Sequence, residues 1–327
     1  MKSYAAVDLG PLHDFVEFTP ASEEFRADVM AGLALPQKQL AAKYFYDARG
    51  SRLFDRICEL PEYYPTRTET AILRDHAGAF RTLIGPHASL IEFGSGSSSK
   101  VRVLLDTLES IAAYVPVDIS REHLLASAKE LAEAYPDLRV LPVCADYTRP
   151  FEIPTIPGER ARVGFFPGST IGNFTHEEAV RFLRAAAIDL GTDNGLLIGV
   201  DMPKDAGILH AAYNDTAGVT AAFNKNILRR INDELGGDFD LDAFEHDARW
   251  VAEASRIEMH LVSRNRQRVH VGGRSFGFAA GESIHTENSH KYDVGGFHTL
   301  AARAGWRAVS HWVDADRLFS IHYLRVA

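Results

Sequence analysis

Short apolar runs alternate with segments of helical spacing through the middle of the chain. The apolar runs are typical of strands buried on both faces, and they are Ser89–Phe93, Ala112–Val117, Val140–Val143, Val163–Phe166 and Leu196–Val200. The segments of helical spacing lie between them, at Lys100–Leu108, His123–Ala134 and Thr175–Ala187. This alternation predicts βαβ units, so we expect an α/β fold built on a buried parallel sheet.

The pattern changes after Asp201, the residue that ends the fifth apolar run. A long helical stretch, Ala206–Leu235, is followed by segments in which apolar and polar residues alternate, at Arg256–Ser263 and Gln267–Val271. We therefore expect residues 203–287 to form an α+β insertion.

The two ends of the chain add further elements. The C-terminal part predicts a helix and then a hairpin that completes the first sheet, and these segments are Phe297–Ala304, Trp306–Val313 and Leu318–Val326. Near the N-terminus we expect a helix over Glu23–Leu33 and a second helix over Glu69–Phe80, capped by Thr68. The aromatic and proline residues between Leu60 and Thr66 favour a loop.

Length and composition agree with two domains. The chain has 327 residues, of which 46% are hydrophobic and 24% charged, which is typical of a globular protein of this size. We assign residues 68–202 and 288–327 to the sheet domain, and residues 1–67 and 203–287 to a second domain.

Net charge, cysteine content and the length of the apolar runs limit which molecules the protein can bind and where in the cell it is expected. The formal net charge of −9 argues against a nucleic-acid partner, because duplex binding needs a basic surface. The two cysteines, Cys58 and Cys144, cannot form a disulfide framework. No apolar run approaches the roughly 20 residues that span a bilayer, and the first 20 residues lack the apolar core of a signal peptide. We expect a cytoplasmic protein that acts on a small molecule or a protein, without a membrane partner.

A glycine loop after the first strand is the strongest local signal. The chain reads Glu92-Phe-Gly94-Ser-Gly96-Ser-Ser-Ser-Lys100, between a predicted strand and a predicted helix. Small residues there allow a ligand to approach the backbone, and the helix N-terminus offers free N–H groups. The spacing excludes a P-loop, and Ser99 replaces the third glycine of a dinucleotide fingerprint.

Acidic residues at three successive strand ends indicate which nucleotide binds. Asp118 ends the second strand, where a carboxylate accepts hydrogen bonds from ribose hydroxyls, and Asp146 ends the third. Glu92, two residues before Gly94, suits a cationic methionine group and would repel a pyrophosphate. The pattern favours a class I S-adenosylmethionine methyltransferase with a Rossmann-like sheet. The alternative for Asp118 or Asp146 alone is a turn or cap residue.

A polar run follows the fourth strand and is a candidate substrate site. It reads Gly168-Ser-Thr170-Ile-Gly-Asn173, at the sheet edge where open α/β folds bind ligands. Thr170 and Asn173 are the side chains best placed to contact a substrate. The alternative is a simple turn before a helix that begins with a Thr175/Glu178 capping box.

Several long motifs resemble the histidine-specific Nα-methyltransferase family of ergothioneine biosynthesis. The resemblance covers the chain from about Phe25 to the C-terminus. The motifs are Tyr44-Phe-Tyr-Asp47, Leu60-Pro-Glu-Tyr-Tyr-Pro-Thr-Arg-Thr-Glu69, Gly168-Ser-Thr-Ile-Gly-Asn173, Tyr213-Asn-Asp-Thr-Ala-Gly-Val-Thr-Ala-Ala-Phe-Asn224, Asp238-Phe-Asp-Leu-Asp-Ala-Phe-Glu-His246, Arg256-Ile-Glu-Met259 and Phe278-Ala-Ala-Gly-Glu282.

This resemblance implies a reaction and a domain role. The family transfers three methyl groups from S-adenosylmethionine to the α-amine of L-histidine and forms hercynine, the trimethyl betaine. Its fold pairs the methyltransferase domain with a substrate-binding domain, which here corresponds to residues 1–67 and 203–287. The family also suggests a monomer.

The resemblance further implies roles for individual residues. Asn173 and Tyr213 match the residues that hold the histidine carboxylate, Glu287 and Ser289 those that hold the imidazole, and Met259 a residue beside the ring. The remaining pocket positions match Tyr46, Phe54, Tyr63, Gly168 and Thr170. The cofactor contacts match Gly94, Lys100, Asp118, Asp146 and Tyr147. Two departures are Asn288, where an apolar residue is expected, and the serine-rich glycine loop.

The chemistry is compatible with these roles. Methyl transfer from a sulfonium depends on positioning, and the amine must lose its proton before it reacts. We predict that Tyr46 touches the amine, while Tyr63 and Phe54 surround the growing cation; packing is the alternative role for all three. Glu287 would set the specificity because a carboxylate accepts the imidazole N–H. Without the resemblance, Glu287 would be assigned to an exposed loop and Met259 to the core.

Three other interpretations follow from the same residues. A methyltransferase of the same fold could act on another amino acid, such as tryptophan, a distinction that depends on Glu287 and Met259. A binding protein without turnover is disfavoured because the cofactor and substrate motifs are both retained. We expect no metal site, since the fourteen histidines include no HExxH, and His285 and His290 lack a ligand-like spacing.

Overall fold

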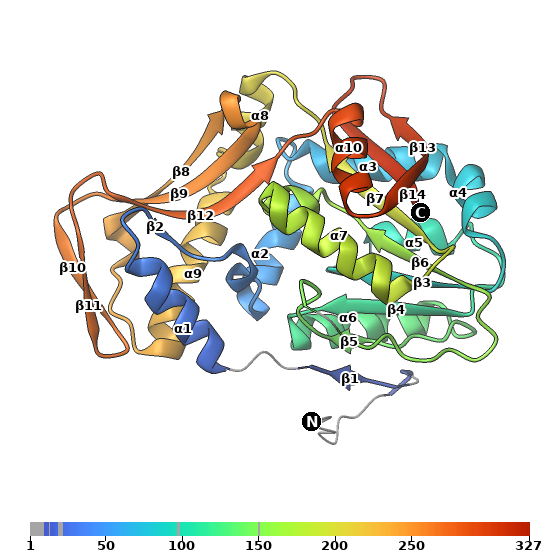
Figure 1. The fold of residues 1–327 in the computed structure, drawn as a ribbon. Helices are drawn as coiled ribbons and strands as arrows, with labels where there is room; N and C mark the ends of the chain where they lie inside the picture. Colours follow the sequence, from blue (N-terminus) through green and yellow to red (C-terminus); the bar gives the residue numbers. More distant parts are fainter. Residues whose placement is uncertain (1–9, 13, 19–21, 97–98, 150) are drawn as a thin grey trace. The chain divides into compact units, whose positions relative to one another are not determined.

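The chain forms two compact units in the computed structural model (Figure 1), which describes all residues except 1–9, 13, 19–21, 97–98 and 150. Unit 1 comprises Met1–Thr19, Pro65–Pro203 and Lys291–Ala327, and unit 2 comprises Pro20–Tyr64 and Lys204–His290. In the described part of the chain, no helix combines the length and the apolar character needed to cross a bilayer.

Unit 1 contains an eight-stranded sheet in the order β1-β5-β4-β3-β6-β7-β14-β13. Its strands are β1 (Val16–Glu17), β3 (Ala88–Phe93), β4 (Ala113–Asp118), β5 (Val143–Cys144), β6 (Ala161–Phe166), β7 (Gly195–Asp201), β13 (Trp306–Val313) and β14 (Phe319–Val326). The strands from β1 to β7 pair in parallel, and β14 is antiparallel to both β7 and β13. The predicted α/β class, the parallel sheet and its completion by the C-terminal hairpin are confirmed.

Helices alternate with the strands of this sheet (Figure 1). They are α3 (Tyr64–Asp75), α4 (Ala77–Ile84), α5 (Ser99–Leu105), α6 (Arg121–Ala134), η2 (Thr170–Asn173), α7 (His176–Leu190) and α10 (Val294–Arg303). Of these, α5, α6 and α7 connect successive parallel strands. The predicted capping box begins α7: the Thr175 hydroxyl accepts from the Glu178 N–H, and the Glu178 carboxylate accepts from the Thr175 N–H.

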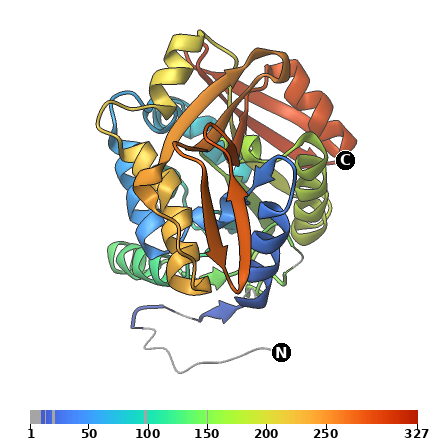
Figure 2. The same cartoon turned by 90° about the vertical axis from the view of Figure 1, so that its left-hand side faces the viewer.

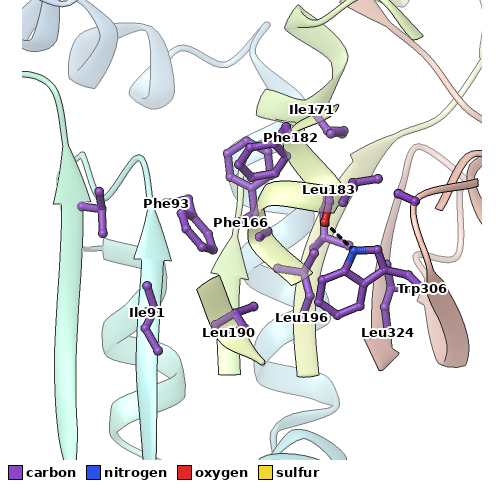
Figure 3. Packing of buried hydrophobic residues seen from close by; sticks show 14 of the residues in the cluster. Ile91, Phe93, Phe166, Ile171, Phe182, Leu183, Leu190, Leu196, Trp306 and Leu324 are labelled. Carbon is purple, nitrogen blue, oxygen red and sulfur yellow. Dashed lines mark hydrogen bonds between the residues drawn. The ribbon is translucent and has the colours of Figure 1, made fainter. Parts of the chain in front are cut away.

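Both faces of the sheet are buried, as the near-continuous apolar strands predict. Ile91 and Phe93 of β3 point into one cluster, shown in Figure 3, while Leu90 of the same strand belongs to the cluster on the other face. The Trp306 indole N–H donates to the Leu183 carbonyl at 2.8 Å (Figure 3), so its polar atom is satisfied within the apolar cluster.

Unit 2 is built on a four-stranded sheet in the order β2-β12-β9-β8, with a separate β10–β11 hairpin that can be followed in Figures 1 and 2. Its strands are β2 (Lys38–Gln39), β8 (Phe244–Val251), β9 (Arg256–Ser263), β10 (Gln267–Val271), β11 (Arg274–Phe278) and β12 (Ser283–His290). Its helices are α1 (Ser22–Leu33), η1 (Ala42–Phe45), α2 (Ala48–Glu59), α8 (Ala206–Tyr213), α9 (Val219–Leu235), η3 (Leu241–Ala243) and η4 (Ala252–Ala254). The α+β insertion is therefore present.

Two predicted helices have different limits in the structure. The helix expected over Glu69–Phe80 begins at Tyr64 and ends at Asp75, and a separate helix follows, so Thr68 is an interior residue and not a cap. Pro65 favours this early start, because a proline in the first helical turn loses no hydrogen bond. The helix expected over Ala206–Leu235 is two helices, and Gly218 supplies the left-handed residue (φ 69°) between them.

The N-terminal boundary of the two predicted domains also differs. We expected residues 1–67 to belong to the second domain, but β1 pairs in parallel with β5 and extends the sheet of unit 1. At the other boundary, residues 288–290 continue β12 and belong to unit 2. Strand pairing decides the domain assignment at both boundaries, and the local composition of a segment does not predict which strand it pairs with.

Candidate functional site

The glycine loop after β3 has the backbone geometry of a ligand cradle. Gly94 (φ 75°) and Gly96 (φ 46°) adopt left-handed conformations that disfavour side chains, while Ser97 and Ser98 lie outside the described residues. The N–H groups of Gly94 and Ser95 donate to the Val117 carbonyl, at 2.8 and 3.2 Å. This ties the loop to the end of β4.

Asp118, at the end of β4, contacts this loop. Its Oδ2 accepts from the Gly96 N–H at 3.4 Å, and its Oδ1 accepts from the Ser120 N–H at 2.8 Å. Desolvation raises the pKa of the carboxyl group, and these hydrogen bonds partly oppose the shift. The structure thus places Asp118 beside the glycine loop, where the sequence predicted a ribose contact.

Asp146 and Tyr147 follow β5, the next strand of the sheet. Asp146 is buried, and its Oδ1 accepts from the N–H and the hydroxyl of Thr148 at 3.0 and 2.5 Å. The Tyr147 ring lies over Gly94, where an added Cβ would meet it at 3.6 Å. Burial raises the pKa of the Tyr147 phenol, so the ring offers a neutral stacking surface.

Glu92 is a buried acid beneath the same loop. The Tyr114 hydroxyl donates to its Oε2, yet burial dominates and raises the pKa of Glu92 to about 8. Glu92, Asp118 and Asp146 therefore lie at or near the carboxyl ends of three neighbouring parallel strands, β3, β4 and β5. A cationic ligand would relieve the electrostatic cost of ionising Glu92 there.

Lys100 is held by a glutamate to which the sequence analysis gave no role. Its Nζ lies 2.6 Å from Oε2 of Glu69, whose side chain is completely buried. The same carboxylate accepts from the Gly168 N–H at 2.8 and 3.1 Å, so Glu69 connects α3 and α5 with the turn after β6. Glu69 and Lys100 are 31 positions apart in the chain, so no local sequence pattern could predict that they form an ion pair.

The polar run after β6 is a turn and a 3-10 helix. Gly168 (φ 78°) and Ser169 (φ 57°) adopt left-handed conformations, and the Thr170 hydroxyl donates to the Pro167 carbonyl at 3.0 Å. Asn173 ends η2 and is partly exposed. Ser169 Oγ accepts from the Asp201 N–H at 2.9 Å, which attaches this turn to the end of β7.

The aromatic residues expected around the substrate lie together in unit 2. Tyr46 and Phe54 are edge-to-face with ring centroids 5.7 Å apart, and Phe54 and Tyr63 are 6.4 Å apart. Tyr63 continues the series to Tyr213, also at 6.4 Å. Burial is the largest influence on Tyr63 and raises the pKa of its phenol well above the usual value.

The remaining expected substrate residues join this aromatic series. The Tyr213 hydroxyl donates to Ser289 Oγ at 2.7 Å. On the sheet, Met259 of β9 is paired in register with Glu287 of β12, next to an irregularity between His285 and Glu287. Glu287 is buried with 9% exposure, so it is not the exposed loop residue that local sequence suggests. Its charge also contributes to the raised pKa of Tyr63.

One further group of ionisable residues went unrecognised in the sequence. Glu258, His260 and His285 each offer a ligand atom, and these atoms lie within 4.8 Å of one another. A His-x-x-x-His pattern identifies a metal site on a helix. It cannot identify this group, because its residues come from two paired strands.

Comparisons with known proteins place the chain in a family. Residues 25–326 match the model of a family described as "Histidine-specific methyltransferase, SAM-dependent". A histidine N-alpha-methyltransferase of Mycolicibacterium smegmatis is 42% identical over 308 residues, which cover 93% of this chain and 95% of that protein.

Two other relatives agree. A histidine N-alpha-methyltransferase of Mycobacterium tuberculosis is 42% identical and covers 88% of this chain and 91% of its own length. Ergothioneine biosynthesis protein 1 of Neurospora crassa is 29% identical over 88% of this chain, which corresponds to 33% of that longer protein. The sheet order, the glycine loop and the match over almost the whole chain agree: this protein belongs to the family of histidine-specific, S-adenosylmethionine-dependent methyltransferases.

Proposed function

We propose that this protein transfers three methyl groups from S-adenosylmethionine to the α-amine of L-histidine and so produces hercynine for ergothioneine biosynthesis. Family membership supports the reaction class and the cofactor. The observation that carries the choice of substrate is the pairing of the buried Glu287 with Met259, next to the hydrogen-bonded Tyr213 and Ser289.

The cofactor residues of unit 1 fit a cationic nucleoside. S-Adenosylmethionine supplies a methyl group on a positively charged sulfur. Asp118 is suited to the ribose hydroxyls and Asp146 to the adenine edge, with the Tyr147 ring available for stacking. Glu92 is suited to the cationic methionine portion, because a neighbouring positive charge stabilises its carboxylate form. Lys100, oriented by Glu69, completes the set.

In this proposal the residues of unit 2 recognise the imidazole. Glu287 accepts a hydrogen bond from a ring N–H, Ser289 contacts the other ring nitrogen, and Met259 packs against the ring face. An amino acid without a matching N–H would lose this hydrogen bond, which is worth about 1.5–3 kcal/mol when one group is charged. This cost supports selection of histidine.

The histidine carboxylate is assigned to Asn173 and Tyr213, with Gly168 and Thr170 as neighbouring contacts. The Tyr213 hydroxyl donates to Ser289 Oγ in the structure. Donating to a carboxylate instead requires rotation of this hydroxyl proton, after which Ser289 donates its own proton to another acceptor.

Tyr46 is our candidate for the group that touches the amine. A tyrosine hydroxyl can accept a hydrogen bond from the α-ammonium and orient the nitrogen, whose proton then leaves to water. Each added methyl group enlarges a cation, and the faces of Tyr46, Phe54 and Tyr63 stabilise such a group. Exclusion of water from a site lined by these rings strengthens both effects.

Mass spectrometry tests the substrate directly. The purified protein is incubated with S-adenosylmethionine and each of the twenty amino acids, and products are detected by their mass. We expect a gain of three methyl groups on histidine alone. Methylation of another amino acid, such as tryptophan, in place of histidine would refute the proposal, and an accumulating mono- or dimethyl product would refute trimethylation.

We also propose that the protein works as a monomer in the cytoplasm. Neither Cys58 nor Cys144 forms a disulfide, which agrees with a reducing compartment. Light scattering coupled to size-exclusion chromatography should give the mass of one chain, 36.1 kDa. A mass of two chains would contradict the proposed monomer.

A further inference from the structure

Three metal-ligating side chains meet on the sheet of unit 2, and the proposed reaction uses none of them. Glu258 and His260 are two residues apart on β9 and therefore share a face of the strand, and His285 of β12 is paired in register with His260. Each residue offers one ligand atom, and these atoms lie within 4.8 Å of one another. We infer that Glu258, His260 and His285 form a binding site for a zinc-type divalent ion.

The donor set selects the class of ion. Two imidazole nitrogens and one carboxylate oxygen are the combination that Zn²⁺ commonly uses, whereas Ca²⁺ and Mg²⁺ prefer oxygen ligands alone. With metal–ligand bonds of about 2.1 Å in a tetrahedral arrangement, two donors on one ion lie about 3.4 Å apart. The three donors lie within 4.8 Å of one another, so side-chain rotation must bring them closer to close the set around an ion.

Hydrogen bonds already orient both imidazoles. His260 Nε2 lies 3.0 Å from Glu258 Oε2, and its Nδ1 lies 3.2 Å from Ser283 Oγ. His285 Nε2 donates to the Glu287 carbonyl at 3.0 Å. Ligating histidines characteristically use their second nitrogen for such a bond, which sets the tautomer and the ring angle.

Two neighbours complete the surroundings of the site. Asn288 of β12 is paired with Glu258, and its buried side-chain oxygen lies near the His285 ring. This oxygen is a fourth potential ligand. Arg256 binds Oε1 of Glu258, at 2.8 Å from its Nε, and so leaves Oε2 directed at His260. The positive charge of the arginine also favours the ionised form of the carboxylate.

The site is adjacent to Glu287 on β12. The register irregularity of β12 lies between His285 and Glu287, and the His285 ring bonds the Glu287 carbonyl. An ion bound to His285 would join β9 and β12 at this irregularity. We therefore expect bound Zn²⁺ to raise the thermal stability of the protein.

Zinc binding tests the inference without reference to activity. Protein without an affinity tag is treated with a chelator and titrated with Zn²⁺ against a chromophoric competitor, in the absence of histidine, which itself binds zinc. We expect one equivalent to bind, and we expect Co²⁺ in its place to give the visible absorption of a four-coordinate N/O site. His260→Ala and His285→Ala should each weaken binding at least tenfold.

His270→Ala is the matched control, because His270 is also on a strand of unit 2 and also contacts a carboxylate, Asp238, at 2.9 Å. It should keep the wild-type affinity. Glu258→Gln is a milder variant that keeps the side-chain shape; it should lose the zinc-dependent rise in melting temperature while its circular dichroism stays unchanged. Absence of a stoichiometric site in the wild type, or equal binding by the wild type and the His260 and Glu258 variants, would overturn the inference.

Discussion

The carboxylate of Glu69 and the ammonium of Lys100 form an ion pair of 2.6 Å, in which the glutamate side chain is completely inaccessible to solvent. Glu69 also accepts the Gly168 N–H, so one buried carboxylate orients a proposed cofactor residue and a proposed substrate-contacting turn. Removing one partner of such a pair leaves a desolvated charge, so a substitution at either residue should strongly destabilise the fold.

Replacing Glu69 with glutamine should therefore destabilise the protein and weaken cofactor binding. We expect Glu69→Gln to lower the free energy of unfolding by about 3 kcal/mol, the usual cost of breaking a buried pair. Urea denaturation measures the first effect and calorimetry with S-adenosylmethionine the second. Glu109→Gln is the control: its pair with Arg81 is exposed, so the loss should stay below about 1 kcal/mol. Equal losses in both variants would contradict the role of Glu69.

The absence of a side chain at Gly199 makes room for the same carboxylate. A Cβ on Gly199 of β7 would lie 2.0 Å from Oε1 of Glu69. Gly199→Ala must displace Glu69, and we expect it to cost about 1–3 kcal/mol of unfolding free energy. At Gly277 of β11 nothing lies within 4 Å of an added Cβ, so Gly277→Ala should be close to neutral. Chemical denaturation of the two variants measures both unfolding free energies. An unchanged unfolding free energy in Gly199→Ala would refute the prediction.

The raised pKa of Glu92 predicts that cofactor binding depends on pH. With a pKa of about 8, the carboxyl group is protonated in the cofactor-free protein at pH 7. A neighbouring cation favours the ionised form, so binding releases a proton below pH 8. The affinity for S-adenosylmethionine should then rise with pH, by at most about tenfold per unit, and level off above pH 8.

Calorimetry between pH 6.5 and 9 measures this dependence. In Glu92→Gln the side chain cannot ionise, so the contribution of this residue to the slope should vanish. A wild-type affinity that does not change over this range, or a glutamine variant with the wild-type slope, would exclude Glu92 from contact with the cation.

Asp118 should contribute to cofactor affinity through the ribose. We expect Asp118→Ala to weaken S-adenosylmethionine binding at least tenfold, equivalent to about 1.4 kcal/mol. The variant also loses the acceptor of the Gly96 and Ser120 N–H groups, so its melting temperature is recorded as well. Asp137→Ala, an exposed aspartate of the same unit, is the control. An unchanged affinity in Asp118→Ala would remove this residue from the cofactor site.

Glu287 should determine specificity for histidine without affecting the cofactor. Glu287→Ala should raise KM for histidine by about two orders of magnitude, because loss of a charged hydrogen bond costs about 1.5–3 kcal/mol. KM for S-adenosylmethionine should change little. Steady-state kinetics with each substrate varied in turn gives both values, and Glu245→Ala, an exposed glutamate of β8, is the control. Equal effects on both KM values would argue against a contact with the imidazole.

The sequence alone determined most of unit 1. The strands other than β1, the glycine loop, the acidic strand ends and the Thr175/Glu178 capping box all depend on residues close together in the chain, where periodicity and spacing carry the information. The long motifs also carried the family resemblance, which the comparisons confirm.

Only the tertiary structure decided the contacts between distant segments. Strand pairing put β1 in the sheet of unit 1 and set His260 opposite His285, and helix packing set Glu69 against Lys100. These contacts join residues that local periodicity treats as independent, and their strength comes from burial, which a single segment does not report. The same reason explains Glu287: its neighbours along the chain are polar, but its place on β12 buries it.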